Sequence, residues 1–164
     1  MPATEQTGNA QTKLEQKLII FTDGGARGNP GPAGIGAVFY VEDSSGSQVR
    51  TGEIKKYIGE ATNNFAEYTA LITALEGAAQ YGHKRVECFL DSELVVKQLT
   101  GKYKIREGTL KPLAAKVLAL TNKFEQINFT HVPREKNHEA DKLVNQAIDQ
   151  AIGQAAKPTG LTNS

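Results

Sequence analysis

Four carboxylates stand at positions where α/β proteins present reactive groups, close to the ends of expected strands and helices. Asp23 and Asp91 each follow an apolar run that is typical of a buried strand. Glu67 and Asp141 are each expected in the first turn of a helix. If the four converge on one pocket, they repel one another, and cations are needed to neutralise them. Oxygen ligands alone favour Mg²⁺ or Mn²⁺, and two such ions about 3.5–4 Å apart can catalyse phosphodiester displacement.

Each carboxylate also has an explanation that needs no chemistry. Asp23 can begin a turn, and Asp91 can cap a helix that begins at Ser92. Glu67 and Asp141 suit the amino-terminal turn of a helix because of the helix dipole. For each residue taken alone both explanations stay open, and their convergence in the fold decides between them.

A zinc site built from His131, His138 and Asp141 is the alternative metal centre. His138 and Asp141 are three residues apart at an expected helix start. Zinc prefers more nitrogen or sulfur ligands than this set supplies, and Cys88 lies in the middle of an expected strand. The all-oxygen set is therefore favoured.

The length of 164 residues suggests one domain, and a hydrophobic content of 39% indicates a soluble globular protein. No apolar run approaches the roughly 18 residues that cross a bilayer. The polar N-terminus has no apolar signal core, so we expect a cytoplasmic protein. A single cysteine excludes an internal disulfide. We expect residues 17–156 to form the domain, and residues 1–16 and 157–164 to be disordered tails.

The net charge of +1 says little about partners, but the charge is unevenly distributed. Residues 97–116 carry six basic side chains against one acidic side chain, Glu107. A stripe of this kind is either a phosphate-binding footprint or an ordinary solvated surface. The basic residues are Lys97, Lys102, Lys104, Arg106, Lys111 and Lys116.

Hydrophobic periodicity predicts an α/β fold. Strands are expected at residues 18–21, 35–41, 48–58, 86–90 and 127–132. Helices are expected at residues 62–82, 94–101, 110–124 and from residue 137 onward. This order predicts a five-stranded mixed sheet flanked by helices, with the first three strands antiparallel. With the fourth strand parallel to the first, Asp23 and Asp91 become neighbours at one edge of the sheet.

Four motifs occur along the chain: TDGGARGNPGPAG, TNNFAEY, LDSELV and HVPREKNHEAD. Together they resemble the type 1 ribonuclease H family over residues 17–152. The resemblance implies a ribonuclease H-like sheet whose fourth and fifth strands are parallel to the first. It implies hydrolysis of the RNA strand of RNA/DNA hybrids with two Mg²⁺ ions, Mn²⁺ as a substitute, and 5′-phosphate and 3′-hydroxyl products. We expect a monomer whose partner is the hybrid duplex and not a membrane.

The same resemblance assigns roles to the acidic residues. It implies that Asp23 bridges both ions and that Asp141 helps to hold the ion that activates water. Glu67 and Asp91 would hold the ion beside the leaving 3′-oxygen. The family's mobile histidine lies ten residues before its last catalytic aspartate, which corresponds to His131 here. His131 would relay protons or help product leave, as suits an imidazole, although a strand-end histidine with ordinary contacts is the other interpretation.

The resemblance also implies contacts with the hybrid. Asparagine side chains and backbone amides can read the 2′-hydroxyls of the minor groove, and glycines let the backbone approach a duplex closely. The expected substrate-binding residues are Gly24, Asn29, Thr62, Asn63, Asn64, Ser92 and Asn137.

The chain departs from the family pattern at several places. Residues 101–109 are too few for the long basic protrusion of several bacterial members, so the chain resembles the compact form that lacks it. Phe65 stands where some members have a polar or basic residue, and Glu93 where some have glutamine. With no tryptophan in the chain, Tyr103 is the nearest ring for stacking on a DNA strand.

Three alternatives keep the fold but change the function. A relative that cuts DNA in transposition, integration or junction cleavage needs no contacts to 2′-hydroxyls. A binding module without catalysis would not need the intact carboxylate set. A domain of a reverse transcriptase would carry the same motifs, although the polar tails favour a free-standing enzyme. Cleavage of double-stranded RNA is a further side activity to consider, because its A-form minor groove also presents 2′-hydroxyls.

Overall fold

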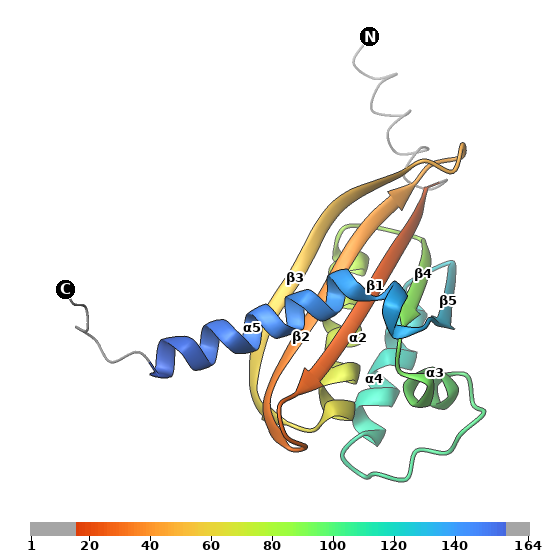
Figure 1. Cartoon of the computed structure of the whole chain (residues 1–164). Coiled ribbons are helices and arrows are strands. Elements are labelled where there is room, and N and C mark those ends of the chain that lie inside the picture. Colours follow the sequence, from red (N-terminus) through yellow and green to blue (C-terminus); the bar gives the residue numbers. More distant parts are fainter. Residues whose placement is uncertain (1–15, 157–164) are drawn as a thin grey trace, which may run out of the picture.

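The computed structural model describes residues 16–156, which form one twisted sheet with helices on both faces (Figure 1). The strands are β1 (Lys17–Ala26), β2 (Gly31–Glu42), β3 (Gln48–Ala61), β4 (Arg85–Leu90) and β5 (Gln126–His131). The helices are α2 (Asn63–Gln80), α3 (Glu93–Leu99), α4 (Lys111–Thr121), the short 3₁₀ helix η1 (Arg134–Lys136) and α5 (His138–Ala156). Apart from Gln16, the expected tails lie outside the described residues. Within 16–156, no helix combines the length and apolar character of a membrane span.

The five strands form one sheet in the order β3-β2-β1-β4-β5. Neighbouring strands among β1, β2 and β3 run antiparallel, while β4 pairs in parallel with both β1 and β5. This arrangement confirms the predicted mixed sheet. The connection from β3 to β4 passes through α2, and the connection from β4 to β5 passes through α3 and α4.

Strand β1 is longer than the apolar run that predicted it. Its pairing with β4 stops at Thr22 opposite Leu90, but its pairing with β2 continues to Ala26 opposite Ala33. The prediction that Asp23 ends the strand is therefore wrong, since Asp23 lies within β1, one residue beyond the last pair with β4. Backbone hydrogen bonds to β2 need no apolar side chains, so hydropathy alone did not reveal these last residues.

The predicted hairpin between β2 and β3 is present, and both strands extend beyond the ranges expected for them. In the connecting turn, Asp43 Oδ1 accepts hydrogen bonds from the backbone N–H groups of Ser45 at 2.9 Å and Ser47 at 3.1 Å. Strand β3 forms one edge of the sheet and leaves most of its side chains exposed or half-buried. That exposure explains why its apolar alternation is loose.

Hydroxyl side chains begin two of the helices. Thr62 caps α2, where its Oγ1 accepts the backbone N–H three residues later at 3.2 Å. Glu67 is the fifth residue of α2, so its expected place in the first turn is wrong. Ser92 caps α3 in the same way at 3.2 Å. Because Ser92 and not Asp91 makes this cap, the capping explanation for Asp91 does not hold.

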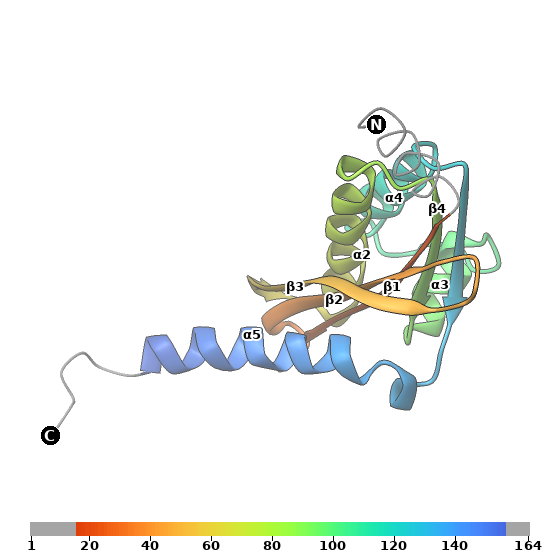
Figure 2. The same cartoon turned by 90° about the horizontal axis from the view of Figure 1, so that it is seen from above.

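Helices α2 and α4 pack on one face of the sheet, and α5 lies on the other face (Figure 2). Cys88 is fully buried between the sheet and α2, and burial raises the pKa of its thiol. On the other face, α5 approaches β2 closely at Gly36, where a Cβ would lie 2.4 Å from the carbonyl oxygen of Ala140. This contact needs a glycine, and it brings the first turn of α5 against the sheet. The core includes Leu18, Ile20, Leu71, Leu75, Val86, Leu90 and Val117.

Candidate active site

Three of the four expected carboxylates meet where the β1–β4 ladder ends. One carboxylate oxygen from each of Asp23, Glu67 and Asp91 lies within 4.8 Å of the other two. Asp23 and Glu67 are buried, with 6% and 7% of their surface exposed, and Asp91 is half-buried. The three come from β1, α2 and the residue after β4. The fold therefore brings together groups that are far apart in the chain.

Strand register and one buried asparagine hold Asp23 and Asp91 side by side. The last parallel pair is Thr22 with Leu90, so the next residue of each chain segment is a carboxylate. The Asn137 side chain is 1% exposed, and its Nδ2 donates to the Thr22 carbonyl at 2.9 Å and to Asp91 Oδ2 at 3.0 Å. The resemblance assigned Asn137 to substrate binding, whereas in the structure its contacts are internal.

Glu67 reaches the pocket because α2 crosses β1 at Gly24. A Cβ on Gly24 would lie 2.2 Å from the Ala66 carbonyl carbon, so the crossing requires glycine. The backbone N–H of Gly24 donates to the Glu67 carboxylate. Within the described part of the chain, Glu67 Oε2 is buried with no hydrogen-bond partner. A buried carboxylate oxygen of this kind needs a partner, and a cation can supply one.

Burial and mutual repulsion oppose ionisation of this pocket. Burial, followed by the charge of Asp91, raises the pKa of Asp23 to about 8. Burial is also the largest cause that raises the pKa of Glu67 well above its ordinary value, and the charges of Asp23 and Asp91 add to it. Bound cations would offset both effects, because positive charge favours the ionised carboxylate. The donor set is all oxygen and therefore fits Mg²⁺ or Mn²⁺.

Asp141 joins the acidic site from the first turn of α5, as expected. It lies outside the three-residue cluster, but its charge also raises the pKa of Asp23. All four carboxylates line one cavity of about 380 Å³. The shared pocket is the feature on which the chemistry inferred from the sequence depends.

His131 lies at the edge of this region. It is the last residue of β5, it pairs with Leu90, and its side chain is exposed. It is not among the residues that line the carboxylate cavity. The pKa of Glu93 is lowered mainly by Lys97 and to a smaller degree by the charge of His131.

Most of the expected substrate-binding residues surround the same cavity. Asn63 accepts the backbone N–H of Ala26 at 2.8 Å through its Oδ1, and Asn29 Oδ1 accepts the backbone N–H of Asn63 at 3.0 Å. Because both amide oxygens are used inside the protein, the NH₂ groups of these exposed side chains remain as donors. The expected residues that line the cavity are Gly24, Asn63, Asn64 and Ser92, whereas Asn29, Thr62 and Asn137 do not.

Three further residues with polar side chains line the cavity and were missed in the sequence. Arg27 and Arg134 stand inside the motifs, but single arginines are common on surfaces and carry little signal by themselves. Asn145 follows Asp141 by four residues, so the two lie on one face of α5. That spacing was the available signal for Asn145.

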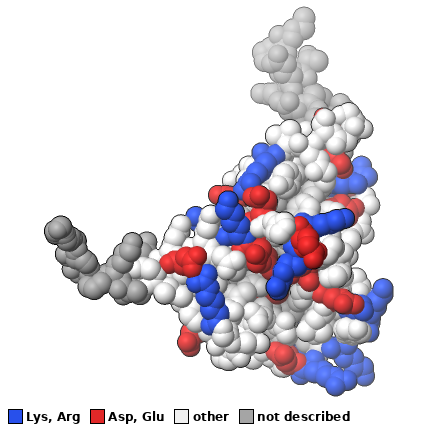
Figure 3. Space-filling model, viewed as in Figure 1, with Lys and Arg blue, Asp and Glu red and all other residues white. Residues whose placement is uncertain are grey.

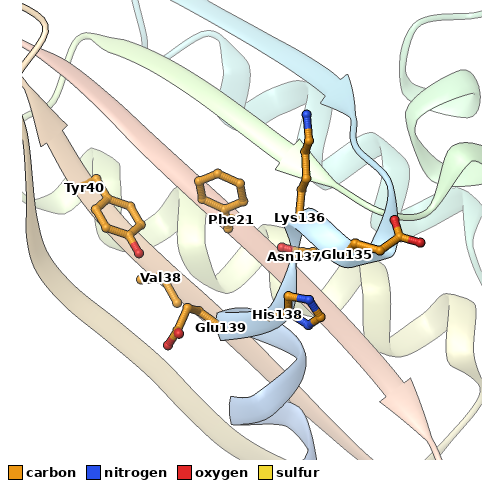
Figure 4. Close-up of a pocket in the computed structure, with 8 residues that line it drawn as sticks. All are labelled: Phe21, Val38, Tyr40, Glu135, Lys136, Asn137, His138 and Glu139. Carbon is orange, nitrogen blue, oxygen red and sulfur yellow. The ribbon is translucent and has the colours of Figure 1, made fainter.

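The alternative zinc set is not assembled. His138 begins α5 and lines a separate cavity of about 270 Å³ together with Phe21, Tyr40 and Glu139 (Figure 4). His131 does not line that cavity. Among residues 16–156, the one group of three or more His, Cys, Asp and Glu side chains close enough to share a metal ion is the acidic cluster.

Basic side chains gather on the loop between α3 and α4, at the lower right of Figure 3, where this loop lies in Figure 1. Lys97 binds back to the protein: its Nζ lies 2.6 Å from Glu93 Oε1 and 4.8 Å from the centre of the Tyr103 ring. The remaining basic residues of the loop line a cavity of about 470 Å³ with Tyr103. These residues are Lys102, Lys104 and Arg106.

Comparisons with known proteins find relatives over most of the chain. The family model described as reverse transcriptase-like matches residues 21–147. Ribonuclease HI of Halobacterium salinarum is 41% identical over 148 residues, which are 90% of this chain and 72% of that protein. The RNase H1 crystal structure from that archaeon has a TM-score of 0.74 and covers 82% of this chain and 98% of its own.

Two more relatives extend the comparison. LC11-RNase H1, solved in complex with an RNA/DNA hybrid, is 50% identical with a TM-score of 0.74, and the match covers 82% of this chain and 99% of that one. A bifunctional protein of Mycobacterium tuberculosis is 44% identical over 140 residues, or 85% of this chain. The match spans only 38% of that protein's length. Family model, sequence identity and fold agree, and this chain belongs to the ribonuclease H family.

Proposed function

We propose that this chain is a metal-dependent endoribonuclease that hydrolyses the RNA strand of RNA/DNA hybrids. The observation that carries the proposal is the acidic cavity, in which three carboxylates lie within 4.8 Å of one another and a fourth stands beside them. Membership of the ribonuclease H family, and similarity to LC11-RNase H1 solved with a hybrid, support the substrate class. The products are a 5′-phosphate and a 3′-hydroxyl.

The acidic residues would hold two Mg²⁺ ions, with Mn²⁺ as a substitute. When bound, such ions supply Lewis-acid stabilisation of the phosphate and a water molecule of lowered pKa. Burial of Asp23 and Glu67 strengthens their attraction for cations, because the local dielectric constant is low. Asn137 holds the orientation of Asp91 through the hydrogen bond at 3.0 Å. Asp23 interacts electrostatically with Glu67, Asp91 and Asp141, and it is the candidate to bridge both ions.

Recognition of RNA is assigned to donors beside the cavity. The NH₂ groups of Asn29 and Asn63 can donate to 2′-hydroxyls, which distinguish RNA from DNA. The Ala26 N–H donates to Asn63 Oδ1 at 2.8 Å, and this bond fixes the orientation of the Asn63 amide. The NH₂ group of Asn63 is therefore held at the wall of the cavity. These contacts favour the hybrid over duplex DNA, and cleavage of double-stranded RNA is a secondary activity.

His131 is proposed to relay protons or to assist product release. Its exposed place at the end of β5 allows the side chain to move, and the role requires it to swing toward the carboxylate cavity. The basic loop residues Lys102 and Arg106 would contact phosphates of the duplex, with Tyr103 as a stacking ring. We further propose that the enzyme acts as a monomer in the cytoplasm.

The test is digestion of an RNA/DNA hybrid labelled at the 5′ end of the RNA, in Mg²⁺. We expect RNA fragments with 3′-hydroxyl ends from the wild type and none from Asp23→Asn. Asp43→Asn is the matched control, because Asp43 lies in the exposed β2–β3 turn and should leave cleavage unchanged. Parallel digestions of duplex DNA, a four-way junction and double-stranded RNA test the alternatives. An intact hybrid with cleaved DNA would contradict the proposal.

A further inference from the structure

The turn between β1 and β2 is fastened to α5 by Arg27. Arg27 Nη1 lies 2.5 Å from Asp149 Oδ1, and Nη2 lies 3.3 Å from Asn145 Oδ1 and 3.4 Å from the Asn145 carbonyl oxygen. The backbone N–H of Arg27 donates to the Pro32 carbonyl at 2.9 Å, which closes the turn. One side chain therefore joins a loop beside the cavity to two turns of α5.

Asn145 continues this connection to a catalytic carboxylate. Because its Oδ1 accepts from Arg27, the NH₂ group of the same amide is left to donate to Asp141. Asn145 Nδ2 lies 3.1 Å from the Asp141 carbonyl oxygen and 3.4 Å from Asp141 Oδ2. Arg27, Asn145 and Asp141 all line the acidic cavity.

The opposite side of the turn is fastened to α2. Asn29 accepts the backbone N–H of Asn63 at 3.0 Å, and Asn63 accepts the backbone N–H of Ala26 at 2.8 Å. The turn is thus held between the two helices that supply Glu67 and Asp141. A continuous set of hydrogen bonds leads from the segment around Asn29 to the Asp141 carboxylate.

We propose that Asn145 is a positioning residue that orients the Asp141 carboxylate toward its metal ion and ties it, through Arg27, to the β1–β2 turn. This inference rests on the proposed function. Asn145 is assigned no contact with substrate or metal and acts through Asp141, as hydrogen-bonded partners of metal-binding carboxylates do. A neutral amide suits the position, because it accepts from Arg27 and donates to Asp141 without adding negative charge to the cavity. The exposed ion pair between Arg27 and Asp149 is less important for this role than the hydrogen bonds of Asn145, since exposed ion pairs contribute little to stability.

The experiment measures Mg²⁺ binding to the metal-free full chain by calorimetry, together with kcat and KM on the hybrid. For Asn145→Ala we expect Mg²⁺ affinity and kcat to fall about tenfold or more, with a smaller change in KM. Asn145→Asp keeps an acceptor for Arg27 but loses the donor to Asp141, so it should not restore either value. Gln150→Ala, an exposed change on the same helix, is the matched control and should behave as the wild type.

Arg27→Ala supplies a second variant, in which Asn145 loses one partner, and it should show the same losses to a smaller degree. Wild-type Mg²⁺ affinity and kcat in Asn145→Ala would overturn the inference. It would also be overturned if Asn145→Ala lowered the melting temperature without Mg²⁺ while Mg²⁺ affinity stayed at the wild-type value, since that result makes the residue structural. If the wild type itself leaves the hybrid intact, the proposed function fails, and the Mg²⁺ titration still decides the role of Asn145.

Discussion

Asn137 Nδ2 lies 3.0 Å from Asp91 Oδ2, and the same nitrogen lies 2.9 Å from the carbonyl oxygen of Thr22. Thr22 immediately precedes Asp23 in β1, and Asp91 follows the last residue of β4. The one buried amide therefore connects the Asp91 carboxylate to the backbone next to Asp23. The residue that supplies this amide comes from the segment that leads into α5. Three distant parts of the chain are therefore held in register at the acidic cavity.

Asn137→Ala should weaken both the fold and the site. Removal of the amide leaves a buried carbonyl without its partner, which costs about 1–3 kcal/mol of unfolding free energy. Loss of the bond to Asp91 should lower kcat by about 10–100-fold. Urea unfolding and hybrid digestion measure the two effects. Asn128→Ala is the control, because Asn128 donates at 3.1 Å to Glu87 on the exposed part of the sheet. A variant with wild-type kcat would show that Asp91 needs no such support.

Mg²⁺ should stabilise the protein through the acidic cavity. A ligand that binds only the folded state raises the unfolding free energy by about 2.7 kcal/mol when its concentration is 100 times its dissociation constant. The melting temperature should therefore rise as Mg²⁺ is added at neutral pH, and Asp23→Asn should reduce that rise. Circular dichroism with increasing Mg²⁺ measures the effect. A melting temperature that stays constant over a wide range of Mg²⁺ would argue against a shared site.

Without metal, the stability of the protein should fall as the pH rises from about 4 to 8. The folded chain retains a proton on Asp23, whose pKa is raised to about 8 by burial and by Asp91, while the unfolded chain releases it near the ordinary value of 3.8. The folded state thus binds more protons over this interval, so each rise in pH favours unfolding. Asp23→Asn should flatten the slope. Urea unfolding in EDTA at several pH values measures it, and a slope of opposite sign would contradict the account.

Gly24→Ala should disturb the crossing of α2 over β1. The added Cβ would lie 2.2 Å from the Ala66 carbonyl carbon, and backbone must shift to relieve the clash. We expect a loss of about 1–3 kcal/mol of unfolding free energy and a large loss of activity, because Glu67 moves with α2. Gly77 lies in α2 and has open space where a Cβ would be added. Gly77→Ala should therefore raise the unfolding free energy by about 0.5–1 kcal/mol. Equal effects in the two variants would show that the crossing is not tightly fitted.

Strand order and the acidic set could be predicted from the sequence because both have strong local signals. The apolar runs before Asp23 and Asp91 indicated parallel neighbours, and the register of Thr22 with Leu90 confirms that arrangement. The helix expected from residue 62 is present as α2 with Thr62 as its cap, whereas α3 is capped by Ser92 and not by Asp91. Patterns that repeat within a few residues were therefore informative.

Long-range pairing and side-chain networks carried no such signal. The extension of β1 past Asp23 depends on hydrogen bonds to β2, whose residues are small and follow a turn. The burial of Asn137 depends on how the segment before α5 folds over the sheet, which no local pattern reveals. Arg27 and Asn145 are 118 residues apart, and only the docking of α5 brings them together. Hydropathy reports which residues are buried but not which polar groups meet.

The central claim is that four carboxylates hold two divalent cations against the RNA strand. Anomalous diffraction from a crystal soaked with Mn²⁺ and an RNA/DNA hybrid tests it most directly. The account predicts two strong peaks in the cavity, both in contact with Asp23, one also touching Asp141 and the other also touching Glu67 and Asp91. A cavity without Mn²⁺ peaks would contradict the account. Mn²⁺ bound only elsewhere on the chain while the hybrid is cleaved would contradict it as well.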